Sequence, residues 1–422
     1  MKFVSTRGSA PKIPASAAIS AGIAPDGGLY VPKTFPQFVV DDFDGLSSLA
    51  QFANRLFIPF FEGDKLAGSL AQICDSSLDF AVPVQSVTHD LDVLELFHGP
   101  TAAFKDFGAR FLAQCIDHMA SEKQQTILVA TSGDTGGAVG CAFEKSKHAR
   151  VVILYPKGRV SPFQQHQLTC WGNNVKALEI HGDFDDCQIL VKQAFADEDL
   201  TCQHHLGSAN SINVARLLPQ MSYYAFTAIR HFKKTGQLAN YVIPTGNMGN
   251  GMACLWARAC GLPIGRVVFA INANRTLFDF FVTGKLTPQP SVSTLANAMD
   301  VGNPSNFERY ANLNPLTAEN TQCLMISDQQ IKHRISDDFV SYDQTWCPHT
   351  ACAAESWRQL SADDRRKHWY LVATAHPYKF REVVEPLIGE TIAPPPAMQS
   401  ILDRTTHKTT IRANLGALIA QL

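Results

Sequence analysis

The sequence predicts an α/β protein with parallel sheets, more than one hydrophobic core and an accessory amino-terminal region. Short β-rich runs alternate with longer segments of helical period, which is typical of strands and helices in parallel layers. The chain has 422 residues. Single cores stop growing at about 250–300 residues, so two or three cores are expected. Residues before about position 81 lack the alternation and are expected to form the accessory region.

Six β-rich runs are expected as strands. They are residues 126–130, 151–155, 175–180, 241–243, 267–271 and 369–373. Residues 105–119 are expected as a helix, because apolar side chains recur there at spacings of three and four and mark one buried stripe. A second helical stretch, residues 212–232, contains Pro219, which predicts a kink or a break at that position.

Composition excludes several classes of protein. The chain carries 36 Lys and Arg against 38 Asp and Glu, a formal charge of −2, which argues against a nucleic-acid partner. No export signal follows Met1, and the longest uncharged stretch, around residues 241–257, contains proline and asparagine, so no membrane span is expected.

The eleven cysteines form no C-x-x-C pair, which favours a reducing cytoplasm over a disulfide framework. No metal site is predicted at Cys202, His204 and His205, since adjacent histidines point in different directions.

Two glycine-rich segments each link an expected strand to an expected helix. They are residues 131–137 (TSGDTGG) and residues 244–251 (PTGNMGNG). Small residues let backbone amides converge on an anion at the positive end of a helix. Neither segment has the lysine motif of nucleotide-triphosphate loops or the full dinucleotide motif. Either loop alone is equally compatible with a plain tight turn, but two such loops in one chain favour a ligand.

Lys105 lies in the first turn of the expected helix, where the positive helix end and partial burial both disfavour a charged ammonium. A Schiff-base lysine or a lysine general base requires that environment. The alternative is a surface lysine whose stem covers apolar neighbours, and spacing alone does not decide between the two.

Several motifs give the chain a resemblance to the threonine synthases, which are pyridoxal-phosphate (PLP) enzymes of fold type II. They are residues 5–8, 26–32, 94–101, 103–106, 130–136, 157–162, 183–188, 210–213, 348–351 and 374–377. The sequence departs from the family pattern at Met248, where an aromatic residue is common, and at Tyr378, where a small residue is more common.

The resemblance implies two open parallel-sheet α/β domains of the tryptophan synthase β-like kind. Residues 81–104 and 235–422 would form the large PLP-binding domain, residues 105–234 a smaller mobile domain, and residues 1–80 the accessory region. The cofactor, pyridoxal 5'-phosphate, would form a Schiff base with Lys105, and Thr374 would meet its pyridine nitrogen with a neutral hydroxyl. Five loop residues would bind the cofactor phosphate: Gly246, Asn247, Met248, Gly249 and Asn250.

The resemblance also implies how the substrate binds. Its α-carboxylate would bind backbone amides, Ser132 and Thr135, while Asp134 would turn its side chain outward. Three side chains match the family pattern for the substrate phosphate: Asn210, Ser211 and Arg216. Two basic residues are as compatible with a solvated loop as with this pocket: Lys157 and Arg159. Three motif histidines are interpreted as structural donors rather than catalytic groups: His98, His349 and His376.

The reaction implied by the resemblance converts O-phospho-L-homoserine and water into L-threonine and phosphate, with closure of the smaller domain to control water. One alternative is a related PLP-dependent phospholyase that releases phosphate and ammonia and leaves a 2-oxo acid. A non-catalytic binding protein on the same fold is opposed by Lys105, and a kinase is opposed by the missing lysine motif. The sequence carries no signal for the oligomeric state.

Overall fold

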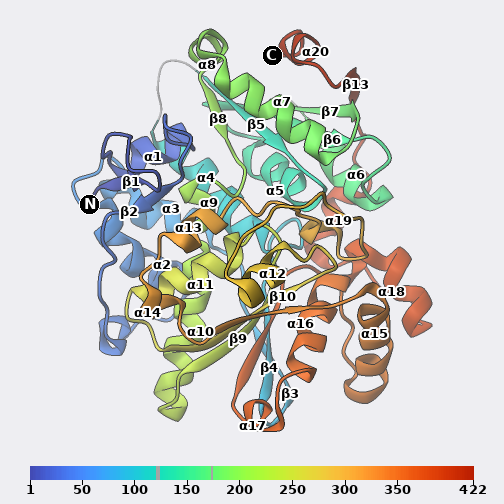
Figure 1. Cartoon of the computed structure of the whole chain (residues 1–422). Coiled ribbons are helices and arrows are strands. Elements are labelled where there is room, and N and C mark those ends of the chain that lie inside the picture. The colour runs from blue at the N-terminus through green and yellow to red at the C-terminus, as the bar shows by residue number, and fades with distance from the viewer. Residues whose placement is uncertain (120–123, 173) are drawn as a thin grey trace.

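The computed structural model describes residues 1–119, 124–172 and 174–422, and it contains two large sheets that lie one above the other in the view of Figure 1. The larger sheet has the strand order β11-β10-β9-β12-β4-β3, and only β3 runs antiparallel to its neighbour. Its strands are β3 (Val84–Thr88), β4 (Leu91–Glu95), β9 (Ala239–Pro244), β10 (Ile264–Ile271), β11 (Thr321–Met325) and β12 (Trp369–Ala373).

The smaller sheet is entirely parallel, with the order β13-β7-β6-β5-β8. Its strands are β5 (Gln125–Ala130), β6 (Ala149–Pro156), β7 (Val175–His181), β8 (Leu206–Ser208) and β13 (Thr409–Arg412). All six predicted strands are present in the two sheets, which confirms the α/β class and the parallel layers.

The carboxyl-terminal strand differs from the predicted division of the chain. Residues 235–422 were expected in one domain, but β13 pairs with β7 of the smaller sheet, beside which the carboxyl terminus lies (Figure 1). The Glu179 carboxylate of β7 accepts hydrogen bonds from Lys408 Nζ at 2.6 Å and Thr410 Oγ1 at 2.9 Å. Hydrogen bonds from polar side chains therefore help to hold β13 against β7. Hydrophobic periodicity did not predict this strand.

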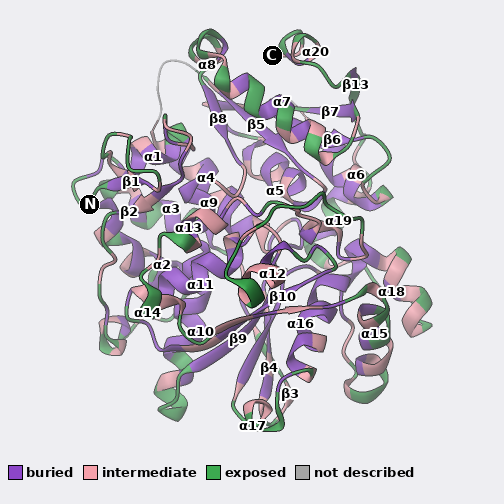
Figure 2. Ribbon diagram, viewed as in Figure 1, coloured by how far each residue is buried: buried purple, intermediate pink, exposed green. Residues whose placement is uncertain are grey.

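Helices cover both sheets, with buried faces turned inward and exposed faces turned outward (Figure 2). Around the smaller sheet are α4 (Lys105–His118), α5 (Asp134–Phe143), α6 (Pro162–Thr169), α7 (Phe184–Ala196), α8 (Glu198–His204), α9 (Val214–Leu217) and α20 (Leu415–Ile419). The remaining helices after residue 80 are α10 (Gln220–Thr235), α11 (Gly249–Ala259), α12 (Thr276–Thr283), α13 (Phe307–Ala311), α14 (Pro315–Ala318), α15 (Asp328–Tyr342), α16 (Pro348–Arg358), α17 (Ala362–Arg365), α18 (Arg381–Ile388) and α19 (Pro396–Leu402). None of the helices in the described ranges is long and apolar enough to cross a membrane.

The amino-terminal region is a small layer beside the two sheets. It holds a two-stranded antiparallel sheet and three helices: β1 (Phe3–Ser5), β2 (Tyr30–Pro32), α1 (Ala15–Ala21), α2 (Leu49–Phe57) and α3 (Leu70–Ser77). Helix α3 packs on α4, and α2 packs on α10. The region therefore contacts the helix that begins at Lys105 and the helix that follows Pro219.

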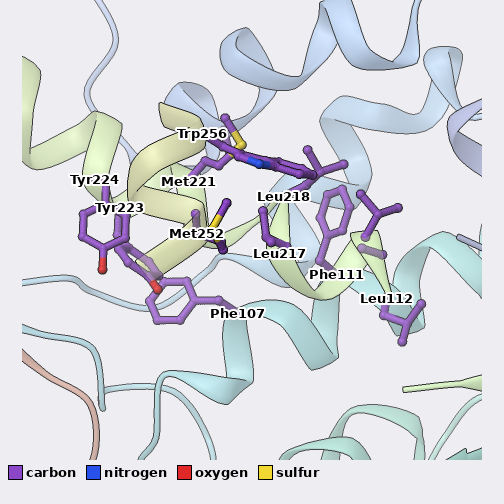
Figure 3. Close-up of a cluster of buried hydrophobic side chains, with 14 of the residues drawn as sticks. Phe107, Phe111, Leu112, Leu217, Leu218, Met221, Tyr223, Tyr224, Met252 and Trp256 are labelled. Carbon is purple, nitrogen blue, oxygen red and sulfur yellow. The ribbon is translucent and has the colours of Figure 1, made fainter. Parts of the chain in front are cut away.

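One hydrophobic cluster joins the helix that begins at Lys105 to the helix that begins at Gly249. Figure 3 shows Phe107 and Phe111 of α4 beside the α9–α10 segment and beside Met252 and Trp256 of α11. The predicted break at Pro219 is confirmed, because α9 ends at Leu217 and α10 begins at Gln220. The break lets the short α9 pack against both α4 and α11, while the longer α10 packs against α11.

Candidate functional site

One cavity, of about 1250 Å³, is lined by loops that follow strands of both sheets. Ligands of open α/β sheets bind at these carboxyl ends of the strands. Every residue predicted for the cofactor and the substrate lines it: Lys105, Ser132, Thr135, Asn210, Ser211, Arg216, Gly246, Asn247, Met248, Gly249, Asn250 and Thr374. The residues that were only weakly indicated, Lys157 and Arg159, are exposed and lie outside the lining.

Lys105 is held at the cavity by backbone contacts with the end of β12. The Phe104 amide donates to the Thr374 carbonyl at 2.8 Å, and Ala103 forms a bridge with Ala375. Ala102, just before this bridge, has a φ of 51°, in the left-handed region that costs a non-glycine residue energy. The backbone contacts of Ala103 and Phe104 with the end of β12 therefore stabilise the strained conformation at Ala102. They also place the start of α4 beside Thr374.

The Lys105 amine has the properties of a reactive lysine. Its Nζ donates to Thr135 Oγ1 at 3.0 Å. Burial lowers the pKa of Lys105 to about 8, with smaller contributions from Arg216 and Lys379, while Asp134 acts in the opposite direction. The interpretation as an exposed lysine is wrong, because this side chain is half-buried and its amine points into the cavity wall. A neutral amine is therefore available near physiological pH.

The first glycine-rich loop ends in the amino terminus of α5. Gly133 has a φ of 145°, and a Cβ there would lie 2.5 Å from Gln164 Nε2, so the loop requires glycine. Thr131 Oγ1 accepts hydrogen bonds from the amides of Gly133 and Gly136, both at 3.0 Å. The amides of Asp134 and Thr135, the first two residues of α5, have no carbonyl partner within the helix, and they remain available to an anion.

The predicted outward orientation of Asp134 is wrong. The residue is 5% exposed, and its Oδ1 lies 3.0 Å from Lys379 Nζ. Gln164 Nε2 donates to the same oxygen at 3.4 Å. No local pattern indicates this partner, because Lys379 lies 245 residues away in the chain and meets Asp134 only through the tertiary fold.

The second glycine-rich loop ends in the amino terminus of α11. Met248 adopts φ 60° immediately before the helix. Asn250 Oδ1 accepts hydrogen bonds from the hydroxyls of Tyr223 at 2.5 Å and Tyr224 at 2.7 Å. Its Nδ2 is buried and has no hydrogen-bond partner in the described part of the chain. The loop thus offers helix amides and one unused amide donor at the cavity.

A network that sequence reasoning missed joins this loop to two other segments. Asn247 Nδ2 donates to Ser211 Oγ at 2.6 Å, and Asn306 Nδ2 donates to the Asn247 carbonyl at 2.9 Å. The fully buried Arg309 donates to the carbonyls of Tyr30 and Ile212 at 3.2 and 2.6 Å. The amino-terminal region, the 210–213 segment and the glycine loop are therefore one connected unit.

Arg216 and Asn210 also line the cavity. Asn210 Nδ2 donates to the Ala130 carbonyl at 2.8 Å, and an Arg216 nitrogen donates to the Ala209 carbonyl. Arg216 Nε is buried without a partner among the described residues. Burial lowers the pKa of Arg216 to about 10, so the guanidinium stays charged at neutral pH.

The motif histidines differ in position. His349 lines the cavity, and its Nε2 accepts the Ala298 amide at 3.1 Å. Burial lowers the pKa of His349 to about 4, which keeps the ring neutral. His98 Nε2 lies 2.7 Å from Glu95, and His376 Nδ1 accepts the Tyr378 amide at 3.2 Å, both outside the cavity lining. Within the described residues, no group of three or more His, Cys, Asp or Glu is placed to hold a metal ion.

These features meet the requirements of PLP. A cofactor phosphate needs amide donors at a helix start, which α11 and the unused Asn250 Nδ2 supply. The cofactor aldehyde needs a neutral amine, which the lowered pKa of Lys105 favours. The close packing of Gly246 against Met299, where a Cβ would lie 2.6 Å from Met299 Cα, brings the loop backbone to the cavity.

Comparisons with known proteins agree with this site over the whole chain. Residues 91–354 match the family of pyridoxal-phosphate dependent enzymes, residues 2–78 match the threonine synthase N terminus, and residues 350–421 match the threonine synthase C-terminal family. A threonine synthase from Serratia marcescens is 37% identical over 424 residues, which cover 99% of this chain and 98% of that protein.

Two solved structures have the same fold. Threonine synthase from Escherichia coli matches with a TM-score of 0.92 at 36% identity, covering 100% of this chain and 99% of that one. PLP-bound threonine synthase from Brucella melitensis matches with a TM-score of 0.91 at 32% identity, covering 100% and 98%. The fold, the poised lysine and these full-length similarities together establish that the chain belongs to the threonine synthase family of PLP-dependent enzymes.

Proposed function

We propose that this enzyme converts O-phospho-L-homoserine and water into L-threonine and phosphate in the cavity described above. The observation that carries the proposal is the position of Lys105. Its amine donates to Thr135 Oγ1 at 3.0 Å and lies at a cavity that also receives the amino termini of α5 and α11. A phosphorylated cofactor and a substrate with a carboxylate and a phosphate ester bring three anionic groups. The site offers one reactive amine, two helix amino termini and the charged Arg216 guanidinium to meet them.

We propose that the cofactor is held by the residues that the sequence indicated. Lys105 would bond to its aldehyde, and Thr374 would meet its ring nitrogen. The loop of Gly246, Asn247, Met248, Gly249 and Asn250 would bind its phosphate. The unused Nδ2 of Asn250 supports this assignment, since a buried amide donor without a partner is costly unless a ligand accepts from it.

Gly246→Ala is expected to weaken PLP binding about ten-fold or more. A Cβ at this position would lie 2.6 Å from Met299 Cα and 3.2 Å from its carbonyl carbon, so the phosphate loop must shift, at an overpacking cost of about 1–3 kcal/mol. Titration of the apoprotein with PLP, followed by the cofactor absorbance, measures the effect. Gly68→Ala is the matched control, because a Cβ there meets no atom within 4 Å. Equal affinities for the two variants would show that the loop tolerates the methyl group.

The substrate would bind between the two helix starts. Its α-carboxylate would bind the first-turn amides of α5 with Ser132 and Thr135, and its phosphate would bind Asn210, Ser211 and Arg216. Ser211 Oγ accepts from Asn247 at 2.6 Å, which leaves its hydroxyl proton free to be donated to an anion. The buried Arg216 Nε is a further donor without a partner in the described chain, and its fixed charge suits a phosphate ester.

The chemistry would then depend on where protons are held. PLP, when bound, supplies an electron sink that stabilises negative charge developing at the substrate Cα. Lys105, once released, would take the proton from Cα, give a proton to a phosphate oxygen of the substrate, and then take the proton from Cβ for delivery to Cγ. The lowered pKa of its amine favours both the uptake and the release of these protons. Arg216 would stabilise the phosphate as the Cγ–oxygen bond breaks and its electron pair leaves with oxygen. Protonation at Cγ, addition of water at Cβ and return of a proton to Cα complete threonine.

Water has to be excluded until phosphate has left. We propose that the unit carrying the Ser132–Thr135 loop closes over the substrate when its carboxylate and its phosphate are both bound. The 1250 Å³ volume supports this proposal, because it leaves room for movement around a cofactor and a small amino acid.

The test is to identify the organic product. The cofactor-loaded enzyme is incubated with O-phospho-L-homoserine, and the product is identified by mass together with released phosphate. L-threonine is the expected product. Release of 2-oxobutanoate with ammonia would instead assign the phospholyase reaction, and the absence of any product would leave only ligand binding.

We propose a reducing compartment, the cytoplasm, as the site of action. All eleven cysteines are free thiols, and nine of them are buried, at positions 74, 115, 170, 187, 254, 260, 323, 347 and 352. Free buried thiols are typical of proteins that fold where disulfides do not form.

A further inference from the structure

Lys379 is a buried cation that none of the motifs indicated. It lies in the 3-10 helix η5 (Pro377–Phe380), shortly after the end of β12, and it is 0% exposed. Its Nζ donates to the Thr101 carbonyl at 2.9 Å and lies 3.0 Å from Asp134 Oδ1. One ammonium group therefore connects the strand end that carries Thr374, the turn before Lys105 and the first residue of α5.

Asp134 is the only other member of this ion pair, and it lies at the cavity wall. Charged and titratable groups face it from three elements: Lys379 of η5, Lys105 of α4, and His349 of α16 with the buried thiol of Cys347 at the start of that helix. Burial favours the neutral form of Asp134, but the charges of Lys379 and Lys105 outweigh burial and lower the pKa of this carboxyl. The carboxylate is thus ionised, and its charge is compensated by the buried ammonium.

An ionised carboxylate at the first turn of α5 conflicts with anion binding there. The helix amides attract an anion, whereas the Asp134 charge repels it, and the repulsion between like charges is strong in a site with little water. The conflict disappears if the charge of Asp134 is neutralised from the side away from the ligand.

We propose that Lys379 is a positioning residue that neutralises Asp134, so that the amino terminus of α5 accepts the substrate α-carboxylate. The proposal rests on the proposed function of the Ser132–Thr135 loop. It assigns Lys379 no contact with substrate or cofactor. The effect passes through Asp134 and through the Thr101 carbonyl that Lys379 holds beside the start of α4.

The proposal predicts opposite effects for two single substitutions. Lys379→Met leaves the Asp134 carboxylate uncompensated, so the substrate carboxylate binds more weakly. Asp134→Asn leaves the Lys379 charge in excess, so the carboxylate binds as tightly as in the parent or more tightly. The double variant D134N/K379M restores charge balance and recovers most of the affinity that K379M loses.

Removal of Lys379 also makes binding depend on pH. Without its partner, buried Asp134 is protonated at low pH and does not repel the substrate, whereas at high pH it ionises and does. The KM of K379M for O-phospho-L-homoserine is therefore expected to rise about 100-fold above the parent value towards about pH 9 and to approach the parent value towards about pH 6. The double variant has no carboxylate at this position, so its KM is expected to follow the parent profile.

The experiment measures kcat and KM for the cofactor-loaded parent, both single variants and the double variant across this pH range. A second measurement titrates each protein with L-threonine, which carries the same carboxylate, and follows the cofactor absorbance, so that affinity is obtained without turnover. Thermal melting checks that each variant is folded. If K379M does not fold, the double variant and D134N still test the proposal through the L-threonine affinity.

A KM of K379M that matches the parent at high pH would overturn the proposal. So would a double variant whose KM is as high as that of K379M at every pH, because packing rather than charge would then explain the loss. Tighter or equal L-threonine binding by D134N is expected, and clearly weaker binding would also overturn it. Failure of the proposed function is a separate result, since it appears as absence of threonine in the parent enzyme.

Discussion

Replacing Lys105 with alanine is expected to reduce kcat/KM for threonine formation by about 10⁴-fold or more. The substitution removes the amine that would bond to the cofactor and that would move protons at Cα and Cβ, and a positioned acid–base group alone contributes about 10²–10⁴-fold. Loss of the hydrogen bond to Thr135 Oγ1 adds little, because Thr135 lies at the cavity and can bind water instead. The measurement is a steady-state assay that detects threonine by mass.

Lys157→Ala is the matched control for this substitution. Lys157 is also a motif lysine that follows a strand of the smaller sheet, but it is exposed and lies outside the cavity lining. Its variant is expected to retain activity within about two-fold of the parent, as surface substitutions usually do. Comparable losses in the two variants, or threonine formation by K105A at the parent rate, would contradict the role given to Lys105.

The Lys105 amine also predicts how cofactor uptake depends on pH. Only the neutral amine reacts with an aldehyde, and burial lowers the pKa of Lys105 from its ordinary value of 10.5 to about 8. The rate at which apoprotein takes up PLP is therefore expected to rise as the pH approaches about 8 and to level off above it. Stopped-flow absorbance after mixing apoprotein with PLP measures this profile. A rate that keeps rising towards about pH 10 would indicate a lysine with an unshifted pKa.

Local sequence signals predicted the elements that place the reactive lysine. The strand runs, the apolar stripe of residues 105–119 and the break at Pro219 follow from periodicity and from proline, and all are present. Five strands of the two sheets were missed: β3, β4, β8, β11 and β13. β8 is only three residues long, and β13 has a single buried residue, Ile411, so neither forms a recognisable hydrophobic run.

The sequence predicted the residues that line the candidate site, but not the buried residues that hold them in place. Residues that lie in glycine-rich loops or family motifs were found, because those patterns carry a local physical meaning. Lys379 and Arg309 carry none, since a buried cation is recognisable only when its partners are known. The error at Asp134 has the same origin. Repulsion from a carboxylate ligand was evident in the sequence, but the compensating ammonium was not.

Arg309→Met is expected to lower the free energy of unfolding by about 3–5 kcal/mol and to weaken PLP binding. The guanidinium is 0% exposed and donates to the carbonyls of Tyr30, Ser211 and Ile212, as well as to Asn306 Oδ1 at 2.6 Å. Methionine fills a similar volume, yet it leaves several buried oxygens without a donor, and each such group costs about 1–3 kcal/mol. Since Asn306 also holds the Asn247 carbonyl, the damage reaches the phosphate loop.

Arg7→Met separates this effect from a general loss of the amino-terminal attachment. Arg7 lies between β1 and β2 and forms an ion pair at 3.0 Å with Glu308, the residue before Arg309. The Arg7 side chain is 54% exposed, so water screens the pair and its contribution to stability is small. Urea unfolding of both variants, with and without PLP, compares the two arginines. The arginine that stabilises the site should be the buried one, because water can replace the exposed guanidinium at Glu308 but cannot reach the carbonyls that Arg309 satisfies. Equal loss of unfolding free energy in the two variants would contradict this role. Arg309 would then only attach the β1–β2 sheet, and the contact between Asn247 and Ser211 would hold the second glycine-rich loop without it.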